Sequence, residues 1–146
     1  MYDWVKKYVG MEFKSGGRTS DGCDCYGLVR LILANEYSVL LPSFTRGYFD
    51  ANDQNQTGGL FKKYMPLILA EKIEVPEEKA LAIIRTRGLC THVAIYAGDG
   101  YMMHIMANTA AVCDRIDNPM LAGRIEGWYR VSQSYCTDES PVTGKG

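Results

Sequence analysis

The stretch that decides the fold is Asp21-Gly22-Cys23-Asp24-Cys25-Tyr26-Gly27-Leu28-Val29-Arg30, where a glycine- and serine-rich loop runs into an apolar segment. After the second cysteine, apolar residues recur at helical spacing, at Leu28, Val29, Ile32 and Leu33. This period predicts a helix from about Cys25 to Glu36 with one buried face. The Cys25 sulfur then lies in the first turn, where unpaired backbone N–H groups and the helix dipole favour a thiolate. Cys25 is therefore a candidate nucleophile.

The segments that follow this helix are mostly strands. Apolar runs predict five of them, at residues 80–84, 91–97, 101–106, 112–116 and 126–131, with a hairpin signal at Gly98-Asp99-Gly100. A short amphipathic helix is expected at residues 2–9, with Trp4, Val5 and Tyr8 on its buried side. Residues 42–59 are polar and turn-rich, which is typical of a binding loop. Helices first and an antiparallel meander afterwards indicate an α+β fold, with N-terminal helices packed on an antiparallel β-sheet.

Length and charge exclude several classes of protein. A chain of 146 residues suits one domain, which we place at residues 1–136, and the polar segment 137–146 is expected to be a disordered tail. The net charge of -1 lacks the basic excess that nucleic-acid binding needs, and no apolar run reaches membrane-spanning length. The N-terminus has no secretory signal pattern, and five cysteines without framework spacing indicate free thiols in a reducing compartment. We therefore expect no nucleic acid, membrane or cofactor as a partner.

Only two histidines are available to act as a base for Cys25. His92 and His104 lie in the second and third predicted strands, on either side of the glycine turn. If that hairpin is centred on Asp99, paired residues sum to about 198, so His104 is a diagonal neighbour of His92 on the same face. The two imidazoles are then close enough to touch. A helix packed across that face would give a cysteine nucleophile, a histidine base and a second ring that orients the base, with backbone N–H groups at the helix start receiving the oxyanion.

Two other interpretations of these residues stay open. Cys25 can be a small buried hydrophobe without chemistry, because a cysteine and two histidines are often unrelated core or surface residues. A metal site is the second, since ligand types occur in pairs at Cys23-x-Cys25 and Cys90-x-His92, with His104 and Cys113 further along. The C-x-C spacing is not that of a zinc knuckle, so we expect no metal. No role follows for Cys23, Cys90, Cys113 and Cys136.

A set of short motifs runs through the chain in a fixed order. They are a Gly-Gly loop at 16–17, Asp-Cys-x-Gly-Leu-Val at 24–29, His-Val-x-Ile-Tyr at 92–96 with Gly98, and a further histidine at 104. Over roughly residues 5–131 the chain thereby resembles the NlpC-like cell-wall cysteine peptidases, a papain-like α+β group. The resemblance implies a Cys-His-His triad with Cys25 as nucleophile, His92 as base and His104 as orienting residue. It also implies cleavage of a bond in the peptidoglycan stem peptide, such as that between D-glutamate and diaminopimelate.

Three further segments narrow the resemblance. They are Phe13 followed by Gly16-Gly17-Arg18, the junction Gly22-Cys23-Asp24-Cys25, and residues 124–130. In these the chain is similar to tail-assembly and tail-tip peptidases of tailed bacteriophages. That similarity implies phage tail-tip proteins as partners and a location at the virion tail tip after synthesis in the host cytoplasm, where the peptidase would aid local cell-wall penetration.

The expected substrate cleft departs from the family pattern at two positions. The cellular members usually have a tyrosine about twelve residues before the cysteine, whose hydroxyl helps the oxyanion site, and Phe13 stands there. The residue after the nucleophile, often serine, is Tyr26. Asp24, Tyr26 and Phe13 are therefore expected to border the oxyanion site or the cleft, with backbone N–H groups or Tyr26 replacing the missing hydroxyl. A structural tail component with weak or no activity, and an intracellular amidase or acyltransferase with the same triad, remain alternatives.

Overall fold

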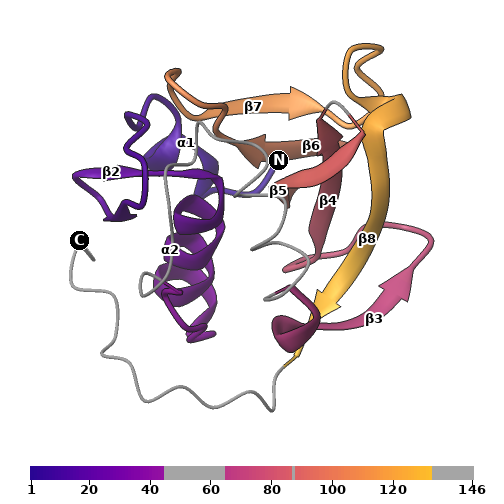
Figure 1. Cartoon of the computed structure of the whole chain (residues 1–146), viewed down its shortest axis with the longest axis horizontal. Helices are drawn as coiled ribbons and strands as arrows, with labels where there is room; N and C mark the ends of the chain where they lie inside the picture. The colour runs from indigo at the N-terminus through magenta and orange to yellow at the C-terminus, as the bar shows by residue number, and fades with distance from the viewer. Residues whose placement is uncertain (45–64, 87, 133–146) are drawn as a thin grey trace.

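A six-stranded antiparallel sheet carries one long helix on one face (Figure 1). The computed structural model describes residues 1–44, 65–86 and 88–132. The sheet has the strand order β3-β8-β4-β5-β6-β7. Its strands are β3 (Leu69–Ile73), β4 (Leu81–Thr86), β5 (Leu89–Gly98), β6 (Tyr101–His104), β7 (Val112–Arg115) and β8 (Ile125–Val131). The remaining elements are α1 (Val5–Tyr8), a small hairpin of β1 (Arg18–Thr19) and β2 (Gly22–Cys23), α2 (Cys25–Tyr37) and the 3-10 turn η1 (Ala122–Arg124).

The helix α2 begins and ends with capping conformations. At its start, the Asp24 backbone is extended and the side chain accepts a hydrogen bond from the Gly27 N–H, as an N-cap aspartate does. At its end, Ser38 takes the left-handed conformation with φ 56°. The predicted helix is present, but the prediction of one buried face was wrong, because all residues from 25 to 34 are buried. A helix covered on all sides lies inside the protein rather than on its surface.

The short helix α1 ties the N-terminal segment to both layers. It is shorter than the predicted 2–9, and Trp4, Val5 and Tyr8 are buried as expected. The Trp4 indole N–H donates to the Tyr37 hydroxyl over 2.7 Å, and the Tyr8 hydroxyl donates to Glu36 over 2.6 Å, at the far end of α2. The Tyr2 N–H donates to the carbonyl of Ala97 in β5 over 2.8 Å.

The sheet confirms the five predicted strands and their α+β order. In the β5–β6 hairpin Ile95 pairs with Met103 and Tyr96 with Met102, which is the predicted register. The meander extends from β4 to β7, whereas β8 returns to the other side of β4. The strand β3 was not predicted because Leu-Ala-Glu-Lys-Ile is charged and largely exposed, as is usual for an edge strand.

The main core lies between α2 and the sheet, and a smaller cluster around Ala82, Ala94, Met102 and Trp128 covers the other face. Within the described ranges, no helix has both the length and the apolar character needed to cross a membrane. The predicted tail at 137–146, Cys136 and most of the loop at 42–59 lie outside the described residues.

Candidate active site

The Cys25 thiol lies where α2 meets the sheet. Cys25 is the first residue of α2, is only 8% exposed, and α2 packs against β5. The backbone N–H groups of Val93 and Tyr26 donate hydrogen bonds to its sulfur. Since Val93 directly follows His92, the fold brings the cysteine to the strand that carries the expected base.

The two histidines touch, as the hairpin register predicts. Nε2 of His92 lies 2.8 Å from Nδ1 of His104, and the ring centroids are 5.0 Å apart. Both side chains are buried. The remaining ring nitrogen of His104, Nε2, lies 2.6 Å from a carboxylate oxygen of Asp114.

Asp114 is a site residue that the sequence did not indicate. It lies on β7, where it pairs with Met102, so it is the diagonal neighbour of His104 on the same face. The signal was present only in part. The strand at 112–116 was predicted, but residues 105–111 contain no turn motif that would centre its register.

Burial determines the resting protonation of Cys25 and His92. It raises the pKa of the Cys25 thiol to about 12, and the Asp24 carboxylate adds to that rise, against smaller opposite effects of the two N–H donors and of Arg18. Burial also lowers the pKa of His92 to about 3, and the neighbouring His104 adds to this. At neutral pH the resting pair is thus a thiol and a neutral imidazole. This burial opposes the expected resting thiolate, because loss of solvent outweighs the local effect of the helix start.

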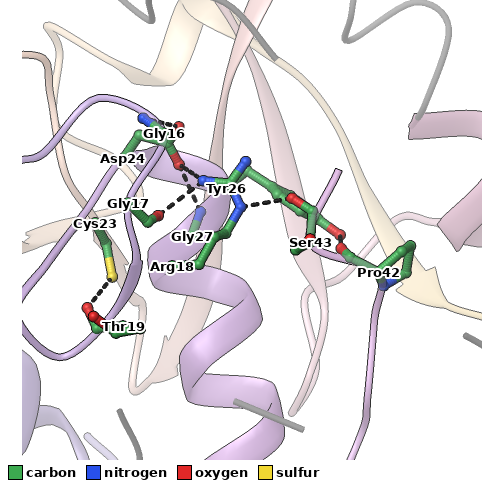
Figure 2. A network of polar contacts seen from close by, with 10 residues as sticks. All are labelled: Gly16, Gly17, Arg18, Thr19, Cys23, Asp24, Tyr26, Gly27, Pro42 and Ser43. Carbon is green, nitrogen blue, oxygen red and sulfur yellow. Dashed lines mark hydrogen bonds and ion pairs between the residues drawn. The ribbon is translucent and has the colours of Figure 1, made fainter. Parts of the chain in front are cut away.

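Asp24 holds the turn that leads into Cys25 (Figure 2). Its carboxylate is fully buried and accepts from Nη1 of Arg18 over 2.7 Å, from the Gly27 N–H over 2.8 Å and from the Gly16 N–H over 3.2 Å. These contacts join the glycine loop, β1 and the first turn of α2. The carboxylate expected in the cleft is therefore used to fix the start of the helix.

Arg18 extends this network to the segment after α2 (Figure 2). Its Nε donates to the carbonyl of Ser43 over 2.6 Å, and its Nη1 donates to the carbonyl of Gly17 over 2.8 Å. Sequence reasoning gave Arg18 no role in the site. The available signal was Asp24 itself, since a buried carboxylate at a helix cap needs a cation nearby.

A close backbone contact explains the glycine in the Asp-Cys-x-Gly motif. A Cβ at Gly27 would lie 2.0 Å from the Gly17 carbonyl oxygen, a distance that no side chain tolerates. The glycine loop therefore lies directly on the first turn of α2. This close contact fixes how near the first turn of α2, which carries Cys25, lies to the glycine loop.

Tyr26 and Phe13 do not supply the missing hydroxyl. Tyr26 is buried and its hydroxyl donates its one proton to the carbonyl of Pro42 over 2.7 Å, while its ring stacks on Phe44. This engagement argues against the expectation that the Tyr26 hydroxyl contributes to an oxyanion site. The Phe13 ring packs against the main core and has no donor. Backbone N–H groups at the start of α2 stay the predicted oxyanion donors.

The ligand types considered for a metal site are arranged differently. Across the described residues, no group of three or more His, Cys, Asp or Glu side chains could hold a metal ion. Nε2 of His92 and Nδ1 of His104 are hydrogen-bonded to each other, so they do not both point towards a shared metal position. The Cys23 thiol donates to the carbonyl of Thr19 over 3.0 Å.

The arrangement defines a class of protein: a papain-like α+β fold in which a cysteine at a helix start lies against a strand bearing a histidine. The chain belongs to the NlpC/P60 family, whose model matches residues 10–130.

Solved structures of the same family share the fold. A Staphylococcus aureus subsp. aureus Mu50 protein, described as similar to a lipoprotein of the NLP/P60 family, matches with 21% identity and a TM-score of 0.58, over 88% of this chain and 39% of its own. A Bacillus cereus ATCC 10987 NlpC/P60 family protein matches with 22% identity and a TM-score of 0.57, over 86% and 37%. The chain thus spans about two fifths of these proteins. The NlpC/p60 domain of the peptidoglycan hydrolase SagA matches with 19% identity and a TM-score of 0.54, over 85% of this chain and 90% of that domain. A search of curated proteins found no significant match.

Proposed function

We propose that the chain is a cysteine peptidase that cleaves a bond in the stem peptide of peptidoglycan, with Cys25, His92 and His104 as its triad. The observation that carries the proposal is the hydrogen bond between His104 and His92, which lies on β5, the strand against which Cys25 packs. Membership of the NlpC/P60 family supports the substrate class, because its members are typically peptidoglycan hydrolases. The SagA domain, which shares the fold, is described as part of a peptidoglycan hydrolase.

Because the resting Cys25 thiol keeps its proton, we place the transfer of that proton at the moment of attack. Cys25 gives its proton to His92 as the sulfur bonds to the scissile carbonyl carbon, and backbone N–H groups at the helix start receive the oxyanion. His92 then gives the proton to the leaving amine, which departs and leaves a thioester on Cys25. Water attacks the thioester with His92 as base, which releases the carboxylate product and restores the thiol.

The finer part of the proposal concerns the bond and the place of action. We infer cleavage between D-glutamate and diaminopimelate, at the tail tip of a bacteriophage, by a protein made in the host cytoplasm. The support is the similarity of Phe13 with Gly16-Gly17-Arg18, of residues 22–25 and of residues 124–130 to tail-tip peptidases. Tail-tip proteins are the corresponding partners.

The test is cleavage of defined muropeptides by the purified protein, followed by mass spectrometry. The wild type should release the two fragments of the stem peptide, and Cys25→Ala should release none. Cys23→Ala is the matched control, because this second buried cysteine bonds to Thr19 rather than to β5, and it should keep its activity. Equal product from the wild type and Cys25→Ala would refute the catalytic proposal.

Phe13 favours one alternative, a structural tail component with weak or no activity. A missing oxyanion donor costs about 2.7–4 kcal/mol of transition-state stabilisation. Tight co-purification with tail proteins, together with normal infection by a Cys25→Ala phage, would support this alternative. A stable thioester on Cys25 formed from a donor other than peptidoglycan would indicate an amidase or acyltransferase instead.

A further inference from the structure

Asp114 continues the histidine pair onto a third strand. His92 lies on β5, His104 on β6 and Asp114 on β7, joined by contacts of 2.8 Å and 2.6 Å. The His104 side chain is 2% exposed and that of Asp114 is 32% exposed. The run of hydrogen bonds through His92, His104 and Asp114 therefore leads from the interior to the edge of the sheet.

We propose that Asp114 is a positioning residue that sets the tautomers of both histidines, so that Nδ1 of His92 is free to accept the proton of Cys25. The inference rests on the proposed roles of Cys25 and His92. It adds a residue outside the triad, and it assigns the direction of each hydrogen bond in the run.

The direction of the first hydrogen bond follows from the carboxylate. A carboxylate accepts hydrogen bonds and donates none, so Nε2 of His104 must carry the proton in the 2.6 Å contact with Asp114. A neutral imidazole has a single N–H. Nδ1 of His104 is then an acceptor.

The second hydrogen bond follows from the first. Because Nδ1 of His104 accepts, Nε2 of His92 must donate across the 2.8 Å contact. In the neutral ring this leaves Nδ1 of His92 without a proton. That nitrogen is the one a general base needs, since Nε2 is already used.

The opposite direction would disable the base. If Nδ1 of His104 donated to His92, the neutral His104 would present a lone pair at Nε2 to the carboxylate, and two acceptors would face each other at 2.6 Å. His92 would then carry its proton on Nδ1 and could not take one from Cys25. Asp114 disfavours this arrangement through repulsion.

The same direction of bonds serves the charged state. When His92 accepts the Cys25 proton, its Nε2–H still donates to His104, and His104 still donates to Asp114. The carboxylate at the end of the run then stabilises the positive charge without any rearrangement. For side chains that orient metal ligands, removing such a partner typically costs about 10- to 100-fold in affinity or activity, and we take the same scale for this site.

The decisive variant is Asp114→Asn, which keeps the shape and a hydrogen bond but adds a donor. Its amide N–H can donate to Nε2 of His104, which allows the reversed direction. The readout is the protonation of the imidazole nitrogens in the ¹⁵N-histidine-labelled full chain at neutral pH. The chain contains two histidines, so the spectrum contains two rings. We expect Nε2–H on both rings in the wild type and a shift towards Nδ1–H in Asp114→Asn.

Activity on muropeptides gives the second readout. We expect kcat to fall by about 10- to 100-fold in Asp114→Asn with KM little changed, and Asp114→Glu to recover the wild-type ring pattern and part of kcat. Asp117→Asn, on an exposed aspartate paired with Arg115, is the matched control and should change neither. Wild-type rings and kcat in Asp114→Asn, or Nδ1–H on His92 in the wild type, would overturn the inference. If no variant cleaves muropeptides but the rings respond as expected, the assigned directions hold and the proposed function fails.

Discussion

The part of the site around Cys25 is held by a buried ion pair and close backbone contacts, whereas the part around His92 is a run of hydrogen bonds between ionisable side chains. We call the first the nucleophile half (Arg18, Asp24, Cys25, Tyr26 and Gly27) and the second the histidine half (His92, His104 and Asp114). The Arg18–Asp24 pair, with a contact of 2.7 Å, fixes a position. The histidine half can carry a proton in more than one place. Changes in the first should therefore appear in stability, and changes in the second in the response to protons.

The largest expected effect comes from removing the cation of the nucleophile half. Arg18→Met leaves the fully buried Asp24 carboxylate without this positive charge. Breaking one side of a buried ion pair costs about 3–5 kcal/mol, so we expect the free energy of unfolding in urea to fall by that order. Arg115→Met is the control, because its ion pair with Asp117 is exposed and should leave unfolding unchanged. Equal losses in both variants would remove the contrast between a buried and an exposed pair.

A steric change in the same half should have the next largest effect. Gly27→Ala places a Cβ against the Gly17 carbonyl oxygen, and relief requires movement of the backbone. Overpacking of this kind costs about 1–3 kcal/mol, measurable by urea unfolding followed by circular dichroism. The control Gly123→Ala adds a Cβ into open space and should be nearly neutral. A stable Gly27→Ala protein would mean that the glycine loop does not support the helix start.

The histidine half should respond to pH instead. Burial lowers the pKa of His92 from 6.5 to about 3, so between these values the unfolded chain binds a proton that the folded protein does not. The free energy of unfolding should fall as the pH drops from 6.5 towards 3, with a contribution of up to about 1.4 kcal/mol per pH unit. Urea unfolding of the wild type and His92→Asn at several pH values isolates this contribution. Parallel curves would show that His92 is not buried in its neutral form.

The smallest expected effect concerns the Tyr26 hydroxyl. Tyr26→Phe removes its hydrogen bond to the Pro42 carbonyl, which should cost about 0.5–1.5 kcal/mol in unfolding. Since that hydroxyl is engaged away from the reaction, kcat on muropeptides should stay within a few-fold of the wild type. A loss of about 10²- to 10³-fold in kcat would instead identify Tyr26 as an oxyanion donor.

The geometry of the histidine pair was predictable, and the state of Cys25 was not. Gly98-Asp99-Gly100 centres one hairpin, and a period of two then places His92 and His104 on the same face. The thiolate expectation drew first on the helix start, which is local in the sequence. Desolvation depends on segments that cover α2 from several sides, and no pattern within the helix sequence shows which distant segments these are.

The same distinction explains the two residues that were missed. Arg18 lies on β1, a strand of two residues that is too short to give an apolar period, and its contact with Asp24 requires the β1–β2 hairpin, which pairs Arg18 with Cys23. Asp114 needed the register between β6 and β7, and the connecting segment carries no turn motif. Both residues act through partners on a neighbouring element, which a pattern within one element does not reveal.

The separation of the two halves along the chain has a consequence for assembly. The contacts of the nucleophile half join residues 3, 6 and 25 positions apart, and those of the histidine half join residues 12 and 10 apart. The contacts only 3 and 6 positions apart are local and form early in folding, whereas the docking of α2 on β5 closes the long loop between Cys25 and Val93. A growing chain therefore carries Cys25 before its base has been made, and the two meet only when the helix docks. Pulsed alkylation during refolding should label Cys25 at early times and find it protected once that docking is complete.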